Sequence, residues 1–129
     1  MPHNPMTTLD DATAQALVRH WLEGWNGGDV DTIMARFAPD IVFSSPGVSM
    51  LTRDSAKTTI EGYDALRAYV EDALRRTGGL RYTLHDTYVG SDSIVLVYAC
   101  GLPGGEPKRG ADFMRVGRDH RVVEWRCHY

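Results

Sequence analysis

The sequence predicts an α+β fold in which three N-terminal helices pack against a strongly curved, mostly antiparallel β-sheet. Up to the pair Gly78–Gly79, apolar residues recur at helical spacing. From residue 80 onward, short apolar runs alternate with turn-forming clusters, which is typical of strands joined by hairpins. A curved sheet that covers helices on one face leaves a hollow between the two layers.

Length and composition favour one soluble domain. The chain has 129 residues, of which 43% are hydrophobic and 24% are charged. The net charge is -3 and the basic residues are scattered, so we expect no nucleic-acid partner. No apolar run approaches the roughly 20 residues that span a bilayer, and the N-terminus lacks the pattern of a signal peptide. We therefore expect no membrane partner and a cytoplasmic protein.

The first helix follows a short tail. Residues 1–7 contain two prolines and no periodicity, so we expect a flexible tail, with a single domain over 8–129. Thr8 with Asp11 predicts a capping box, and Gly27–Gly28 predicts the end of the helix. The residues at helical spacing between these points are Ala14, Leu17, Val18, Trp21 and Trp25.

Two further helices are predicted, with a short strand between them. Asp29 is expected to cap a helix that Pro39 ends, and residues 41–45 are expected to form a strand. The long polar segment 46–61 is predicted to be irregular, either a lid or binding loop or a disordered stretch. Gly62 opens the third helix, whose apolar stripe contains Leu66, Tyr69, Val70, Ala73 and Leu74.

The rest of the chain predicts an antiparallel meander. Its strands are expected at about 80–89, 94–101, 108–117 and 121–129, with turn clusters between them. Cys100 and Cys127 fall inside these strands, where reduced thiols are expected rather than a disulfide.

One carboxylate stands out in the segment 109–116. Period two places Asp112 on the same face as Met114 and Val116, which is a core face. A buried carboxylate must find hydrogen bonds, a cation or a proton, so Asp112 is the main candidate for chemistry. The alternative is that Asp112 caps a loop at the strand end or pairs with Arg109.

Several motifs together resemble a known superfamily. They are Trp25-Asn26-Gly27-Gly28-Asp29, the run from Ile33 to Asp40, the run from Ile60 to Leu66, the run from Asp112 to Val116, and Val122-Val123-Glu124-Trp125. In order and spacing these resemble the NTF2-like (cystatin-like) superfamily, and within it the SnoaL-like small-molecule proteins and the ketosteroid isomerases. The fold hosts isomerases, dehydratases, cyclases, epoxide hydrolases and non-catalytic association domains, so it does not by itself define the function.

The resemblance implies a conical pocket between helices and sheet and a homodimer formed through the outer sheet face. Asp112 matches the position of a protonated aspartic acid that donates to a substrate oxyanion in ketosteroid isomerases. Trp21 stands where those enzymes have an oxyanion tyrosine, and Ser45 stands where they have the catalytic base. Steroid isomerisation is therefore not expected, and the Asp-Arg-Asp arrangement of limonene epoxide hydrolases is not found in register.

The site that follows is a mostly aromatic cavity for a small hydrophobic or aromatic ligand. The residues expected to line it, besides Asp112, are Trp21, Trp25, Ser45, Tyr69, Met114, Trp125, Cys127 and Tyr129. The alternative is that the aromatic side chains simply fill the core. His85 is expected either to meet Asp112 as a base or to lie at the surface.

Two functions from different classes remain open. The first is a SnoaL-like enzyme of the isomerase, cyclase or dehydratase type, in which Asp112 acts as acid, base or oxyanion hydrogen-bond donor without a cofactor. The second is a non-catalytic ligand-binding or dimerisation domain. No metal site is expected, because the histidines and cysteines lack ligand spacing, and no phosphate loop is present.

Overall fold

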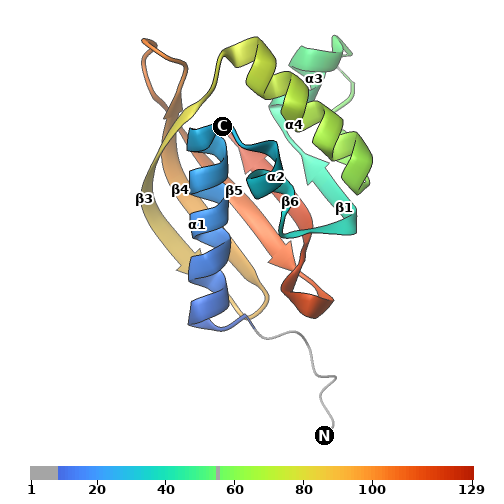
Figure 1. Ribbon diagram of the computed structural model, residues 1–129, viewed down its shortest axis with the longest axis vertical. Helices are drawn as coiled ribbons and strands as arrows, with labels where there is room; N and C mark the ends of the chain where they lie inside the picture. The colour runs from blue at the N-terminus through green and yellow to red at the C-terminus, as the bar shows by residue number, and fades with distance from the viewer. Residues whose placement is uncertain (1–8, 55) are drawn as a thin grey trace, which may run out of the picture.

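The computed structural model describes residues 9–54 and 56–129 and has the predicted α+β architecture (Figure 1). The helices are α1 (Asp11–Gly27), α2 (Val30–Met34), α3 (Pro46–Thr52) and α4 (Tyr63–Thr77), with a 3-10 helix η1 (Arg118–His120). The strands are β1 (Phe37–Ser44), β2 (Thr59–Glu61), β3 (Arg81–Val89), β4 (Ser93–Gly101), β5 (Lys108–Val116) and β6 (Val122–His128). Figure 1 shows α1, α2 and α4 on one side of the sheet.

All six strands belong to one sheet, in the order β2-β1-β6-β5-β4-β3. The strands β3 to β6 form the antiparallel meander that the sequence predicts. The remaining pairing is parallel, between β1 and β6, and β2 then adds an antiparallel edge to β1. The first long strand of the chain therefore lies beside the last one.

Side-chain caps define the two N-terminal helices. Asp10 caps α1 by accepting a hydrogen bond from the Thr13 backbone N–H at 2.7 Å, whereas the predicted cap Thr8 lies outside the described residues. Gly28 ends α1 with φ 63°, a left-handed conformation that favours glycine. The predicted cap of α2 is confirmed, because the Asp29 side chain accepts from the backbone N–H groups of Asp31 at 3.1 Å and Thr32 at 3.4 Å.

The segment after β1 departs from the prediction. Residues 46–61, predicted to be irregular, contain α3 and β2. Ser45 caps α3 and Pro46 occupies its first turn, which is a common helix start that the sequence contained. Pro39 does not end α2, which stops at Met34; it lies within β1, exposed, where the pairing with β6 shifts register.

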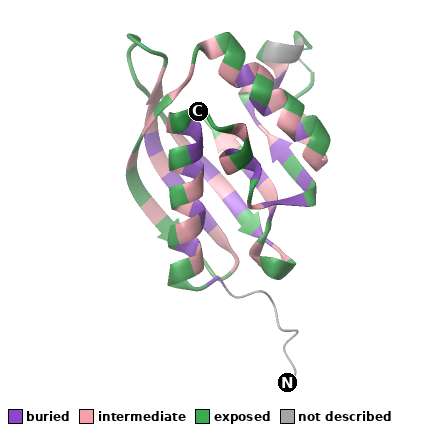
Figure 2. Ribbon diagram, in the orientation of Figure 1, coloured by how far each residue is buried: buried purple, intermediate pink, exposed green. Residues whose placement is uncertain are grey.

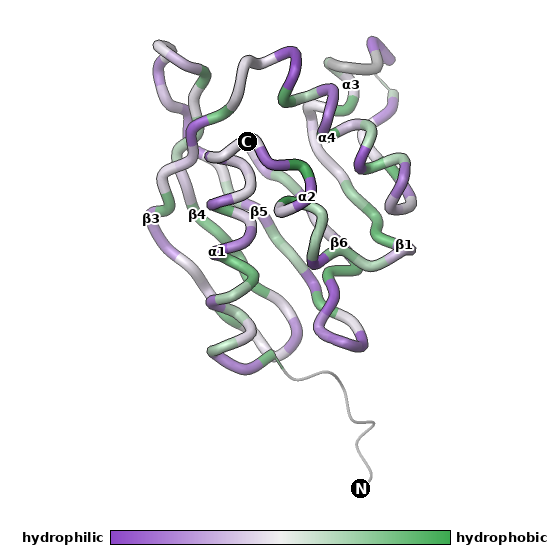
Figure 3. Tube along the Cα trace, in the orientation of Figure 1, coloured by the Kyte–Doolittle hydropathy of each residue, from purple (hydrophilic) through white to green (hydrophobic). Residues whose placement is uncertain are grey.

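The core lies between the helices and the inner face of the sheet. Buried residues alternate along β4 and β5, and Figure 2 shows these buried positions on the strands behind α1. Figure 3 shows hydrophobic stretches on the same strands. The Asn26 side chain fixes α1 to β3, because it donates to the Tyr82 carbonyl at 3.0 Å and accepts from the Tyr82 N–H at 2.7 Å.

Both cysteines, Cys100 and Cys127, are free thiols, as the sequence predicts. Among the residues that the structure describes, no helix has the length and apolar character needed to cross a membrane.

Candidate functional site

Asp112 is the buried polar centre of the inner sheet face. Only 1% of its surface is exposed, and Met114 and Val116 are buried beside it on β5, which confirms the register predicted from period two. The Tyr98 hydroxyl donates to Asp112 Oδ1 at 2.7 Å, and the Trp125 indole N–H donates to Oδ2 at 2.9 Å. The alternative pairing with Arg109 is not found, because Arg109 is exposed and each carboxyl oxygen is bonded from a neighbouring strand.

A glycine allows the Tyr98 ring to reach this carboxyl. Tyr98 on β4 pairs directly with Gly110 on β5. A Cβ atom at Gly110 would lie 2.8 Å from carbon atoms of the Tyr98 ring, so only glycine leaves room for the ring at this point. The ring therefore crosses over β5 and brings its hydroxyl to Asp112, two residues further along the strand.

Burial governs the electrostatics of this site. Desolvation raises the pKa of Asp112 to about 6, although the hydrogen bonds from Tyr98 and Trp125 act in the opposite direction. Burial also raises the pKa values of Tyr82 and Tyr98, so both phenols stay neutral near pH 7. Asp112 can therefore gain or lose a proton close to neutral pH, which is the range that suits a general acid or base.

Trp21 brings an unused hydrogen-bond donor to the same place. Its ring centroid lies 4.8 Å from that of Tyr82 and 5.3 Å from that of Tyr98. The indole also lies close enough to Asp112 to act in the direction that lowers the pKa of that carboxyl. Its buried N–H nevertheless makes no hydrogen bond of standard geometry, and the same holds for Trp25 among the described residues. A buried donor without a partner is costly, so this position favours a group that brings an acceptor atom.

Three other predicted residues continue from Asp112 toward the surface. Cys127 on β6 pairs directly with Asp112 and interacts with both Asp112 and Ser45. The Ser45 hydroxyl and the Tyr129 hydroxyl are 2.6 Å apart, and Ser45 also accepts from the Gly47 N–H at 3.1 Å. The structure thus joins Asp112, Cys127, Ser45 and Tyr129 in one polar row.

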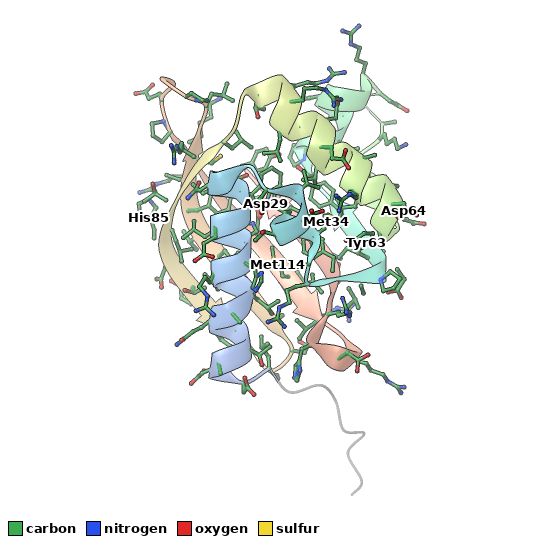
Figure 4. All side chains as sticks on the ribbon, in the orientation of Figure 1. Asp29, Met34, Tyr63, Asp64, His85 and Met114 are labelled. Carbon is green, nitrogen blue, oxygen red and sulfur yellow. The ribbon has the colours of Figure 1, made fainter. Side chains whose placement is uncertain are left out.

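The predicted aromatic residues surround the site, but they contact one another. Phe43 lies 4.5 Å from Trp125 and 5.2 Å from Tyr69 between ring centroids, and Trp25 lies 6.2 Å from Trp125. Met114 is 2% exposed and adds apolar surface in the middle of the molecule (Figure 4). These ring contacts occupy part of the space between helices and sheet that was expected to be an open hollow.

Two clefts open at the surface of the described residues. One, of about 630 Å³, is lined by Asp112, Ser45 and Cys127 of the polar row. Its lining also includes Val95, Phe113 and Arg126 of the sheet and Ser49 of α3. The other, of about 750 Å³, lies between α2, the start of α4 and Arg121. Neither has Trp21 or Tyr98 among its lining residues.

His85 does not join the site. The register between β3 and β4 shifts between Leu84 and Asp86, so His85 has no partner on β4. It is exposed, and Figure 4 shows it at the outer edge of β3. The interpretation of His85 as a base beside Asp112 is therefore wrong, because a bulge changes which side chains of a strand face inward.

Sequence reasoning missed Tyr98 and Tyr82. The alternation of Ile94, Leu96 and Tyr98 was a usable signal, because the first two are the inward residues of β4 and Tyr98 continues their spacing. Within residues 9–54 and 56–129, no group of three or more His, Cys, Asp or Glu residues is arranged to hold a metal ion.

Comparison with known proteins places these residues in a family context. A model of the SnoaL-like domain matches residues 18–125. A SnoaL-like protein of unknown function from Burkholderia thailandensis is 27% identical and superposes with a TM-score of 0.83 over 95% of this chain and 98% of that one.

Two more distant structures share the fold. A proposed polyketide cyclase from Sinorhizobium meliloti is 16% identical, with a TM-score of 0.70 over 87% of this chain and 93% of its own. A proposed isomerase of the SnoaL-like family from Agrobacterium tumefaciens is also 16% identical, with a TM-score of 0.70 over 90% and 96%. No curated protein is significantly similar to the chain.

Proposed function

Because the chain belongs to the SnoaL-like domain family, of NTF2-like fold, we propose that it is an enzyme of the isomerase, cyclase or dehydratase type for a small apolar or aromatic substrate. The observation that carries this proposal is the pairing of a buried carboxyl, Asp112, with the partnerless N–H of Trp21. The names of the cyclase-like and isomerase-like relatives support the same reaction class.

In this proposal Asp112 moves a proton to or from the substrate. Tyr98 and Trp125 hold its two oxygens in place, which fixes the direction in which the proton is delivered. A substrate carbonyl or enolate oxygen beside Trp21 would accept from the indole N–H. Donors that are already in position where negative charge develops stabilise the transition state more than water does.

The substrate enters, we propose, where Tyr129 covers the polar row. The Tyr129 side chain is an exposed end of this row, with 59% of the residue accessible to solvent, and its hydroxyl contacts the buried Ser45. Separation of these two hydroxyls and a shift of the neighbouring rings would open a route to Asp112.

The proposal is tested by proton exchange at carbon. The protein is incubated in D₂O with a panel of cyclic ketones, and deuterium incorporation next to the carbonyl is followed by NMR. Asp112→Asn keeps the size of the side chain but cannot release a proton, so we expect it to lower the exchange rate by at least about 100-fold. His85→Ala, at the exposed edge of β3, is the matched control and should exchange like the wild type.

Exchange by Asp112→Asn at the wild-type rate would contradict the proposal. The second candidate function is a non-catalytic ligand-binding or dimerisation domain, and the close packing of the rings around Trp125 favours it. Titration with phenols, followed by tryptophan fluorescence, separates the two. Binding of a phenol without exchange in any ketone supports the binding domain.

A further inference from the structure

We propose that Cys127 and Ser45 form a proton path that joins Asp112 to solvent at Tyr129. The proposal rests on the function proposed above, since an acid or base that turns over must exchange its proton with water. Its test, however, uses no substrate.

The inner end of the path is fixed by strand register. Asp112 on β5 and Cys127 on β6 are direct cross-strand partners. Side chains of such partners lie on the same face with their Cβ atoms about 5 Å apart. The thiol is close enough to hydrogen-bond to the carboxyl, and this interaction lowers the Asp112 pKa against the larger effect of burial.

The outer end depends on the turn from β1 into α3. Ser45 is the N-cap of α3 and is 3% exposed, with its hydroxyl close to both Cys127 and Tyr129. Because the Ser45 oxygen already accepts from the Gly47 N–H, its own hydrogen can be given to a neighbour. Tyr129 completes the path, since its hydroxyl contacts Ser45 at 2.6 Å while much of the residue is exposed.

Every group on this path can both give and accept a proton. After Asp112 has given its proton away, the Cys127 S–H proton passes to Asp112 and the Ser45 O–H proton passes to Cys127. The Tyr129 O–H proton then passes to Ser45, and water supplies a proton to Tyr129. One proton has moved from solvent to the carboxylate, each group is restored, and nothing is oxidised or reduced.

The two donors that hydrogen-bond to Asp112 do not offer such a route. The Trp125 N–H is a donor without an acceptor, so it cannot pass a proton on. The Tyr98 hydroxyl belongs to a residue that is 2% exposed, and Tyr98 packs against Tyr82 rather than opening to solvent.

Asp112 is the group in this cluster that titrates near neutral pH. The ionisable groups that act on it come from the strands packed around it and the residue after them: Tyr82 on β3, Tyr98 and Cys100 on β4, Cys127 on β6, and Tyr129. Burial raises the pKa of every one of them, so they remain neutral when Asp112 ionises. A pH jump therefore reports on Asp112 itself.

The experiment follows the infrared C=O band of the protonated Asp112 carboxyl after a rapid jump from about pH 4 to about pH 8. Asp112→Asn identifies the band by removing it. We expect Cys127→Ala to slow the decay of the band at least about tenfold, which corresponds to about 1.4 kcal/mol in the barrier. Cys127→Ser restores a group that gives and accepts a proton, so it should return the rate to near the wild-type value.

Two further variants keep the test decisive. Tyr129→Phe removes only the outer hydroxyl and should slow the decay as well, whether or not Cys127→Ala folds. Cys100→Ala removes the inward thiol beside Tyr82, off the path, and should decay like the wild type. Wild-type decay in both Cys127→Ala and Tyr129→Phe, or slow decay in Cys100→Ala, would overturn the path. Because no ketone is present, this result is independent of whether the exchange assay succeeds.

Discussion

At the scale of single residues, the main feature is a carboxyl that the fold places among aromatic rings. Asp112 is held by one phenol and one indole, and no cation neutralises it within hydrogen-bond distance among the described residues. The fold therefore favours the protonated form of the acid. The free energy of unfolding therefore depends on pH, because the same carboxyl ionises more easily in the unfolded chain.

The stability of the protein should accordingly fall as Asp112 ionises. Below about pH 3 the carboxyl is protonated in both states and the raised pKa costs nothing. Between the unfolded value of 3.8 and the folded value of about 6, only the unfolded state releases the proton readily. The shift of roughly two units corresponds to about 3 kcal/mol of folding free energy, which is lost by about pH 7.

Urea unfolding of the wild type and Asp112→Asn across this pH range measures the effect. The free energy of unfolding of the wild type, relative to the variant, should decrease by about 3 kcal/mol from about pH 3 to about pH 7. An asparagine can keep its carbonyl toward Trp125 and give an N–H to the Tyr98 oxygen, so the comparison isolates the charge. A difference that does not change with pH would show that Asp112 ionises as easily when folded.

The sequence was sufficient to predict which side chains face the core where the strand pattern is regular. The alternation around Asp112 was sufficient to place it inside, because β5 pairs without interruption from Lys108 to Arg115. His85 was misjudged because β3 shifts register at that point, and a shift of this kind leaves no mark in the residue types. The inward position of Tyr98 followed from its alternation with Leu96, but its approach to Asp112 depends on the pairing with Gly110, which is a property of the sheet rather than of either segment.

At the scale of elements, the close packing of α1 against α2 depends on one glycine. A Cβ atom at Gly24 would lie 2.8 Å from both the backbone nitrogen and Cγ1 of Ile33, so the two helices approach too closely for a larger residue. Gly27, one turn further along α1, has no atom within 4 Å of its Cβ position. Gly24 is therefore tightly packed against α2, whereas Gly27, in the same helix, has open space around it.

We expect opposite effects from alanine at these two positions. Gly24→Ala should destabilise the protein by about 1–3 kcal/mol, because the helices must separate. Gly27→Ala should leave stability unchanged or raise it by up to about 1 kcal/mol, because alanine favours a helix more than glycine does. Thermal unfolding of both variants checks the pair, and equal melting temperatures would contradict the packing of α1 on α2.

The long elements of the chain were predictable, and the short ones were not. The 17 residues of α1 give enough turns for an apolar stripe to stand out. The 7 residues of α3 and the 3 residues of β2 carry too little periodicity, so their segment was predicted as a loop. The only sequence signal for α3 was its start, where Ser45 is the N-cap and Pro46 lies in the first turn.

At the scale of the whole molecule, the outer sheet face remains partly apolar. Val95, Ala111 and Phe113 are all partly exposed there and border the cleft of about 630 Å³. We propose, as the resemblance implied, that a second copy of the chain covers this face.

Phe113→Glu tests the dimer. It should convert a dimer into a monomer in light scattering while the far-UV circular dichroism is unchanged, because Phe113 lies outside the core. Leu102→Glu, on an exposed residue of the β4–β5 loop, is the matched control and should leave the mass unchanged. A wild-type protein that is monomeric at high concentration would contradict the assembly.

The fold class followed from the order of helical and strand patterns along the chain, whereas the packing of the aromatic rings did not. Whether large side chains line a space or fill it depends on rotamers and on how closely two layers approach. The ring of Trp125, for example, meets Phe37 and Phe43 of β1 and Trp25 of α1. That arrangement arises only when the complete sheet has formed.

The parallel pairing of β1 with β6 has a consequence for biosynthesis. As the polypeptide leaves the ribosome, Phe37 and Phe43 emerge long before Trp125, the ring on which both of them pack. Until β6 is available, the hydrophobic side chains of Phe37 and Phe43 stay exposed to solvent in the nascent chain. We therefore expect the nascent chain to need chaperones that bind exposed hydrophobic segments until β6 has been synthesised. The core should then form in one late folding step, when β6 pairs with β1.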